Sequence, residues 1–210
     1  MSNETTTQSS NRPVQVIGVT SGKGGVGKTN LSVNLAVSLS QLGQRVLIID
    51  ADLGLANVDI LLDESPKATL HDVVTGAKTL DEVVMESSFG VSILPGASGV
   101  TEMTDLDVQQ RMRLLNAVDS LENKFDTLIV DTPAGIGSNA AFFASAVQEV
   151  LVVATPEPTS MTDAYAMIKV LNKTHGVERF GLVLNQVMSV AEAQDVYMRL
   201  NSITSRFLSV

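Results

Sequence analysis

The sequence predicts an α/β domain whose mostly parallel sheet carries helices on both faces. Short runs of apolar, often β-branched residues have the length of buried strands. Stretches with apolar residues three or four positions apart lie between these runs and indicate helices. Because neighbouring parallel strands need a helix-sized connection, this alternation favours a parallel sheet. The 210 residues, 44% of them hydrophobic, suffice for the core of one such domain.

The first three elements form a strand, helix, strand unit. Residues 14–19 are an apolar run that stops at Ser21-Gly22, as a strand does when it meets a loop. Residues 45–50 are a second run that ends in an acid. The helix between them ends at Gly43. Its apolar positions are Leu31, Leu35, Leu39 and Leu42.

Further strands are predicted at residues 91–94, 128–130, 150–154 and 182–184, with helices between them. One helix is marked by Met112, Leu115, Val118 and Leu121, and another by Tyr165, Ile168 and Leu171 or Asn172. No repeat or linker divides the chain, so residues 13–210 are predicted to form one domain. Residues 1–12 are polar and are predicted to be a disordered tail, neither a signal peptide nor a membrane span.

Charge and cysteine content exclude several functional classes. The 14 Lys and Arg against 23 Asp and Glu give a net charge of −9, so no global positive field attracts nucleic acid. Direct nucleic-acid binding is therefore not expected unless a local basic patch exists. The absence of cysteine excludes a thiolate zinc site, a cysteine nucleophile and an iron-sulfur cluster ligated by this chain.

A phosphate-binding loop lies between the first strand and the first helix. The segment Gly22-Lys23-Gly24-Gly25-Val26-Gly27-Lys28-Thr29 fits the pattern G-x-x-x-x-G-K-[ST] in the required context. Its glycines let successive backbone N–H groups face one anion, at the positive end of the helix dipole. Lys28 would reach the terminal phosphates, and the Thr29 hydroxyl would bind Mg²⁺. Asn30 is also expected among the nucleotide-binding residues. The predicted fold is thus a three-layer P-loop NTPase fold.

A phosphate loop also needs an acid at the end of a neighbouring strand to hold Mg²⁺ through water. There are two candidates, namely Asp131 and one of the pair Asp50 or Asp52. Asp131 is preferred because it ends a buried-strand run, with Asp50 placed in the second shell of the metal. Gly135 follows soon after and could let the backbone approach a terminal phosphate.

The loop resembles the deviant Walker A motif of the MinD/ParA ATPases, because Lys23 directly follows its first glycine. The resemblance implies an ATP-sandwich dimer in which Lys23 contacts the phosphates of the partner subunit. It also implies that Asp52 orients the attacking water and that the segment from Asp131 to Gly137 is a second switch. Hydrolysis of ATP to ADP would be slow and regulatory.

Three further positions match the family less specifically. Glu157 and Asp163 fall where its members place acids at the dimer interface, and Asn185 falls where an asparagine reads the adenine edge. For each of these three residues a purely structural role is an equal alternative. Glu157 and Asp163 could be charges at a helix N-terminus, and Asn185 could be a turn residue.

Within the family, residues 27–36, 52–59 and 157–166 resemble the flagellar number and placement regulators of the FlhG or FleN type. This likeness implies the flagellar GTPase FlhF and the transcriptional activator FleQ as partners, and a cytoplasmic location. The chain ends before the last strand and the amphipathic membrane helix of this branch, so we expect a C-terminally truncated sequence. Attachment to the inner membrane or the cell pole would need that helix. The motif by which some members stimulate FlhF is absent from residues 1–12.

Other functions of the same fold remain as alternatives. Division-site selection of the MinD type shares every nucleotide motif, and DNA partitioning of the ParA type would need a basic strip formed by the fold. Reductases and cluster carriers of this fold need cysteine. Its tyrosine kinases carry a tyrosine-rich tail, whereas this chain has only Tyr165 and Tyr197.

Overall fold

The computed structural model describes residues 13–99, 106–121, 124–208 and 210, so the predicted tail at residues 1–12 lies outside the described part. Its strands are β1 (Gln15–Ser21), β2 (Val46–Asp50), β3 (Met85–Glu86), β4 (Ser92–Leu94), β5 (Thr127–Ala134), β6 (Glu149–Ala154) and β7 (Phe180–Leu184). Its helices are α1 (Lys28–Gln41), α2 (Val58–Leu61), α3 (Leu70–Thr75), α4 (Leu80–Val83), α5 (Val108–Asp119), α6 (Ser138–Ser145), α7 (Pro158–His175) and α8 (Val190–Phe207).

The strands form one sheet in the order β3-β4-β2-β5-β1-β6-β7. Every pairing is parallel except that of β3 with β4. The predicted α/β class and the six predicted strands are confirmed. The two-residue strand β3 was not predicted, because so short an element carries no periodic signal.

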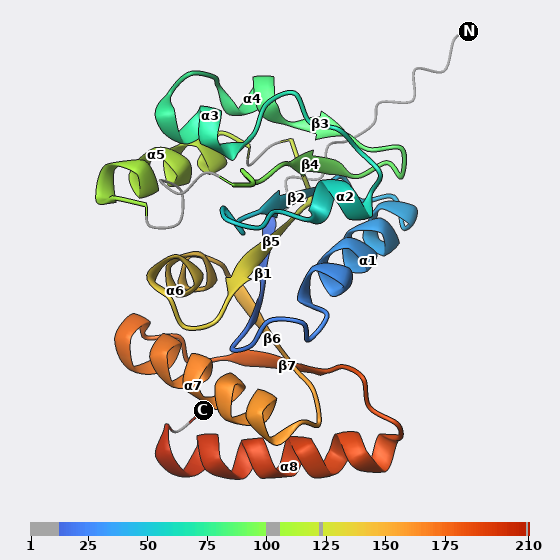
Figure 1. Ribbon diagram of the computed structural model, residues 1–210, viewed down its shortest axis with the longest axis vertical. Coiled ribbons are helices and arrows are strands. Elements are labelled where there is room, and N and C mark those ends of the chain that lie inside the picture. Colours follow the sequence, from blue (N-terminus) through green and yellow to red (C-terminus); the bar gives the residue numbers. More distant parts are fainter. Residues whose placement is uncertain (1–12, 100–105, 122–123, 209) are drawn as a thin grey trace, which may run out of the picture.

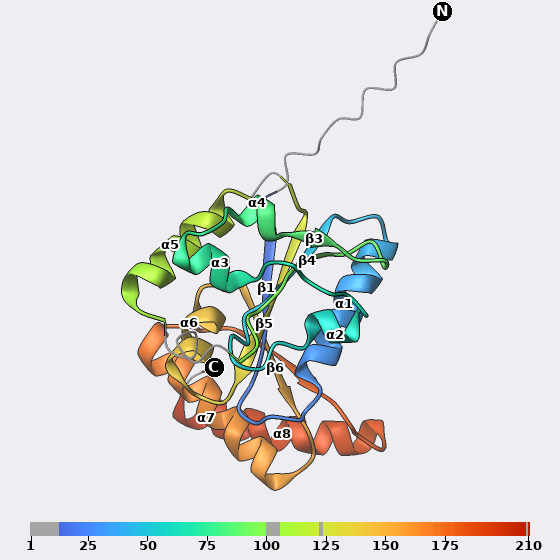
Figure 2. The ribbon, with the colours of Figure 1, turned by 45° about the horizontal axis from the view of Figure 1, so that its top comes forward.

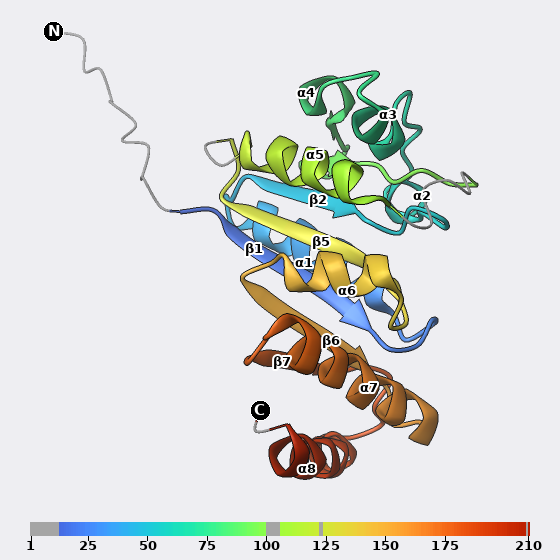
Figure 3. The ribbon, with the colours of Figure 1, turned by 90° about the vertical axis from the view of Figure 1, so that its left-hand side faces the viewer.

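Helices cover both faces of the sheet, which gives the predicted three layers (Figure 1). On β2, Val46 and Ile48 belong to a buried cluster with α1, whereas Leu47 and Ile49 belong to a cluster on the opposite face with α3, α4 and α5. Figure 3 shows α5, α6 and α7 in front of the strands and α1 behind them. A third cluster joins β6 to α6, α7 and α8. This two-sided burial explains why the central strands are apolar throughout rather than alternating.

The functional side chains gather where the parallel strands end. In the central part of the sheet, β5 lies between β1 and β2 (Figure 3), and Asp131 of β5 is in register with both Val19 and Asp50. Figure 2 shows the strands with α1 on one side and α5 and α6 on the other. Ligands of open α/β sheets bind outside this carboxyl edge. None of the described helices is both long enough and apolar enough to cross a membrane.

Candidate functional site

An open cavity of about 650 Å³ lies at the carboxyl edge of the sheet. Most of the predicted phosphate loop lines it, together with Asp52 from the β2–α2 loop and Asn185 from the end of β7. Its lining residues are Ser21, Lys23, Gly24, Gly25, Gly27, Lys28, Thr29, Asn30, Asp52, Leu55, Asn57, Ile60, Leu61, Ala134, Asn185 and Gln186. Residues that are far apart in the sequence are thus brought to one site.

The loop between β1 and α1 adopts its shape because of its glycines. Gly25 and Gly27 have φ values of 77° and 92°, a region that glycine enters without the strain of a Cβ atom. Gly27 precedes the first residue of α1, and its carbonyl accepts from the N–H of Leu31. Gly22 packs so closely on α7 that a Cβ atom would lie 2.0 Å from the carbonyl oxygen of Asp163. The backbone of Asp163 therefore supports the first glycine of the loop.

Lys28 forms a buried ion pair with Asp131 at the base of the cavity. Its Nζ lies 2.9 Å from Oδ1 of Asp131, with 8% and 1% of the two side chains exposed. The same oxygen accepts from the hydroxyl of Ser32 at 3.0 Å. Because both charges are withdrawn from water, each depends on the other for its stability. The predicted phosphate-binding lysine and the preferred metal-binding acid are therefore held together in this structure.

Asp50 is buried directly beside this pair, in register with Asp131. Burial raises its pKa to about 7, the N–H of Val58 opposes that rise, and the nearby charge of Asp131 adds to it. The loop after Asp50 brings Asp52 to the cavity wall, where its Oδ1 accepts from the N–H of Leu55 at 3.2 Å.

Lys23 forms a different kind of pair at the rim of the cavity. Its Nζ lies 2.6 Å from Oε2 of Glu157 and 3.2 Å from Oγ1 of Thr159, at the start of α7. The side chains of Lys23 and Glu157 are 39% and 61% exposed. The sequence-predicted residues Lys23 and Glu157 therefore meet within one subunit.

Asn185 and Gly135 use backbone contacts near the loop. The Nδ2 of Asn185 donates to the carbonyl of Val26 at 2.8 Å, which ties the end of β7 to the phosphate loop. Gly135 has a φ of 89°, and its N–H donates to the carbonyl of Ser21. Asn185 thus braces the phosphate loop, and Gly135 braces the carboxyl end of β1.

The oxygen atoms that the site offers fit Mg²⁺ bound together with a phosphate-bearing ligand. Among the described residues, no group of three or more His, Cys, Asp or Glu side chains could hold a metal ion by itself. Thr29 offers a hydroxyl oxygen at the cavity wall, and Asp131 offers a buried carboxylate. Mg²⁺ prefers such sites with few protein ligands, because water and phosphate oxygens supply the rest of its octahedron.

Comparisons with known proteins agree with this geometry. A family model described as an AAA domain matches residues 14–182. The chain is 51% identical to the antiactivator FleN of Pseudomonas aeruginosa over 198 residues, which cover 94% of this chain and 71% of FleN. It is 36% identical to the flagellum site-determining protein YlxH of Helicobacter pylori, covering 88% of this chain and 62% of YlxH.

A solved structure shares both the fold and the sequence pattern. The septum site-determining protein MinD of Pyrococcus horikoshii, complexed with Mg-ADP, is 31% identical and superposes with a TM-score of 0.73, covering 87% of this chain and 77% of MinD. The chain belongs to the MinD/ParA family. The resemblance carried by Lys23 and the phosphate loop is therefore confirmed at the level of the family.

The fold of this MinD/ParA protein brings several residues to the site that the sequence analysis did not predict. Ser32 was missed although it lies one helical turn after Lys28 and shares its face, a spacing that could have revealed it. Thr159 and Gln186 gave no signal, because their places depend on where α7 begins and on a turn after β7. Gln186 takes a φ of 58°, uncommon for a residue with a side chain.

Proposed function

We propose that this protein is an ATP-dependent, dimerising regulatory ATPase that controls the number and placement of flagella. The observation that carries the proposal is a cavity lined by Lys28 and Thr29, with Asp131 paired to Lys28, in a chain that is 51% identical to FleN. The likeness to YlxH, whose name states a flagellar role, supports the same branch. The chain spans 71% of FleN and 62% of YlxH, so activities of those whole proteins enter only as proposals.

Each site residue has a distinct task in this proposal. Lys28 and the N–H groups of the loop bind the phosphates of ATP, and Thr29 and Asp131 hold Mg²⁺, which neutralises charge on the phosphates. Asp52 orients the water that attacks the terminal phosphate. Loss of that phosphate then removes the contacts that order the segments after Asp52 and Asp131.

Dimerisation is supported by the exposed groups around the cavity. Leu55 and Ile60 line it and are 73% and 69% exposed. Apolar side chains at the mouth of a polar site favour a partner surface that covers them. Closing a second subunit over this face would also bring its Lys23 to the phosphates, in place of the present contact with Glu157.

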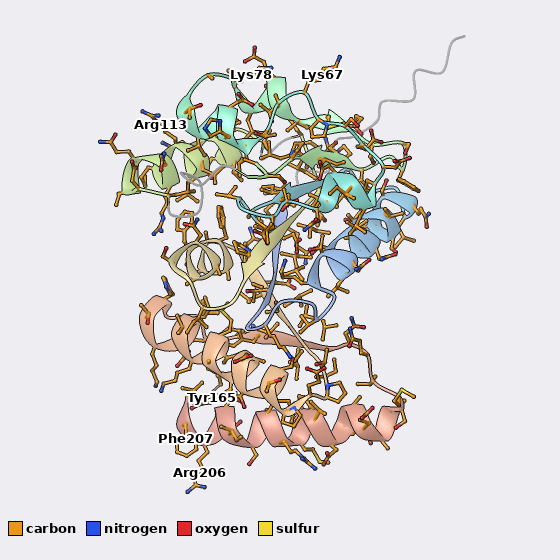
Figure 4. All side chains as sticks on the ribbon, in the orientation of Figure 1. Lys67, Lys78, Arg113, Tyr165, Arg206 and Phe207 are labelled. Atoms are coloured by element: carbon orange, nitrogen blue, oxygen red, sulfur yellow. The ribbon has the colours of Figure 1, made fainter. Side chains whose placement is uncertain are left out.

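The proposed partners are the flagellar GTPase FlhF and the activator FleQ, in the cytoplasm. Direct binding of nucleic acid is not part of the proposal. In Figure 4, Lys67, Lys78 and Arg113 lie at the α3–α5 end and Arg206 at the opposite end. Partitioning on DNA would need a basic strip.

Division-site selection is the second candidate, because the MinD of Pyrococcus horikoshii shares the fold and 31% of the sequence. Complementation separates the two functions. The chain would be expressed in Pseudomonas aeruginosa lacking FleN and, separately, in a strain lacking MinD, with Lys28→Ala as the matched control. We expect flagellar number to return towards normal only in the first strain and only with Lys28 intact. Restored division in the second strain, with flagellar number unchanged in the first, would favour the MinD function.

A further inference from the structure

The loop that joins β2 to α2 carries Asp52, the residue proposed to orient water. Such a residue works only if its carboxylate is held in a defined place, because a displacement of about 1 Å can cost on the order of a hundredfold in rate. The loop itself reaches into solvent at its tip, where Leu55 is 73% exposed. A contact at the base of the loop that is already present without nucleotide would help to hold Asp52 in place.

The buried carboxylate of Asp50 binds both ends of this loop. Its Oδ1 accepts from the N–H of Asp52 at 3.1 Å, and its Oδ2 accepts from the N–H groups of Asn57 and Val58 at 2.9 and 3.0 Å. Asp50 is itself only 1% exposed, on the last position of the central strand β2. One rigidly placed side chain thus closes residues 52–57 into a ring.

Two further contacts make the ring compact. Within it, Oδ1 of Asp52 accepts from the N–H of Leu55. From outside, Gly96 lies so close that a Cβ atom there would be 2.8 Å from the carbonyl oxygen of Asp50 and from Cβ of Ala56. Bonds of carboxylates to backbone N–H groups are among the strong hydrogen bonds of proteins, and they are stronger still when shielded from water.

We propose that Asp50 is a positioning residue whose carboxylate clasps both ends of the loop between β2 and α2. The clasp fixes Asp52 for hydrolysis, and Asp50 has no part in supporting the Mg²⁺ site. Both of its oxygens accept hydrogen bonds from N–H groups at the two ends of the loop, three bonds in all. The carboxylate therefore uses both of its oxygens to hold the loop. The inference rests on the proposed function, since it assigns to Asp50 a part in the reaction proposed for Asp52.

The variant Asp50→Asn tests the clasp with little change of volume. An amide has one accepting oxygen where the carboxylate has two, so it can serve Asp52 or the pair Asn57 and Val58, but not both ends of the loop. The NH₂ group would face an N–H donor at the other end. One end of the loop is therefore released, while the strand and its neighbours keep their packing.

Steady-state kinetics distinguish positioning from metal binding. For Asp50→Asn we expect kcat to fall on the order of ten- to a hundredfold, with KM for Mg-ATP and the half-saturating Mg²⁺ concentration each within about threefold of wild type. Asp131→Asn is the matched control and should raise the Mg²⁺ requirement. A raised Mg²⁺ requirement in Asp50→Asn, with kcat restored by excess Mg²⁺, would overturn the proposal in favour of the metal shell.

Hydrogen exchange tests the clasp without relying on hydrolysis or on a variant that folds. In nucleotide-free wild-type protein we expect the amides of Asp52, Asn57 and Val58 to be protected, although they lie in or beside a loop. Exchange at the rate of an unprotected peptide would overturn the clasp. Protected amides in a protein that does not hydrolyse ATP would leave the clasp standing and remove the proposed function.

Discussion

Two lysines of one loop, five positions apart, make opposite kinds of ion pair. Lys28 and Asp131 are 8% and 1% exposed, whereas Lys23 and Glu157 are 39% and 61% exposed. Breaking a buried pair by removing one partner costs about 3–5 kcal/mol, but an exposed pair contributes about 0–1 kcal/mol. The buried lysine is therefore a fixed part of the site, and the exposed one can exchange its partner at little cost. That difference suits a loop in which one lysine serves its own subunit and the other serves a second.

The largest effect is expected from Lys28→Ala. Removing the ammonium leaves Asp131 buried without its partner, so the free energy of unfolding should fall by about 3 kcal/mol. Binding of ATP and ADP should be lost, which calorimetry would show, and urea unfolding would give the stability. Retained ADP affinity in a folded variant would contradict the role of Lys28.

Asp52→Ala sharpens the comparison by separating binding from hydrolysis. Asp52 lines the cavity without being part of the buried pair, so nucleotide affinity should change little. The hydrolysis rate should fall on the order of a hundredfold, as for loss of a group that assists proton transfer or orients water. Phosphate release measured under saturating ATP checks this, and a normal rate would remove Asp52 from its role.

Lys23→Ala tests the exposed pair directly and is the counterpart of Lys28→Ala. The free energy of unfolding should change by less than about 1 kcal/mol, because the lost pair is solvated. The monomer should still bind ATP and ADP, yet it should not dimerise with ATP. A loss of stability as large as that of Lys28→Ala would mean that the exposed ion pair contributes as much to folding as the buried one.

The smallest effect is expected from Glu157→Gln. It removes the present partner of Lys23 but leaves Thr159 within reach, so thermal stability and ADP affinity of the monomer should stay near wild type. Asp81→Asn breaks another exposed pair, with Lys124, at a distance from the cavity and serves as the control. Both variants should change the free energy of unfolding by less than about 1 kcal/mol.

The sequence predicted the features that follow from local pattern. Strand runs, the loop motif and the acid that follows the predicted strand at residues 128–130 were sufficient to expect Lys28 and Asp131 at one site, because parallel strands present their carboxyl ends at one edge. In the structure β5 continues past Asp131 to Ala134. The contact of Lys23 with Glu157 could not be predicted. It joins residues 134 positions apart and depends on β1 lying next to β6.

The environment of Asp50 likewise depends on folded geometry. An apolar strand ending in an acid gave no indication that three N–H groups would converge on that carboxylate, since their directions follow from the path of the 52–58 loop. The clasp is proposed in place of the supporting role at the Mg²⁺ site that the sequence led us to expect for Asp50, and the kinetics of Asp50→Asn decide between the two. The roles of Asn185, Gly135 and Asp163 towards nucleotide and partner stay predictions.

The most direct test of the account is the mass of the particle formed with ATP and Mg²⁺, measured by light scattering after size separation. Asp52→Ala would be compared with the double variant Asp52→Ala, Lys23→Ala, each with ADP and then with ATP. We predict twice the monomer mass of 22.2 kDa for Asp52→Ala with ATP alone, and a monomer for the double variant under both conditions. An ATP-dependent dimer that persists without Lys23 would contradict the assignment of this lysine to the second subunit.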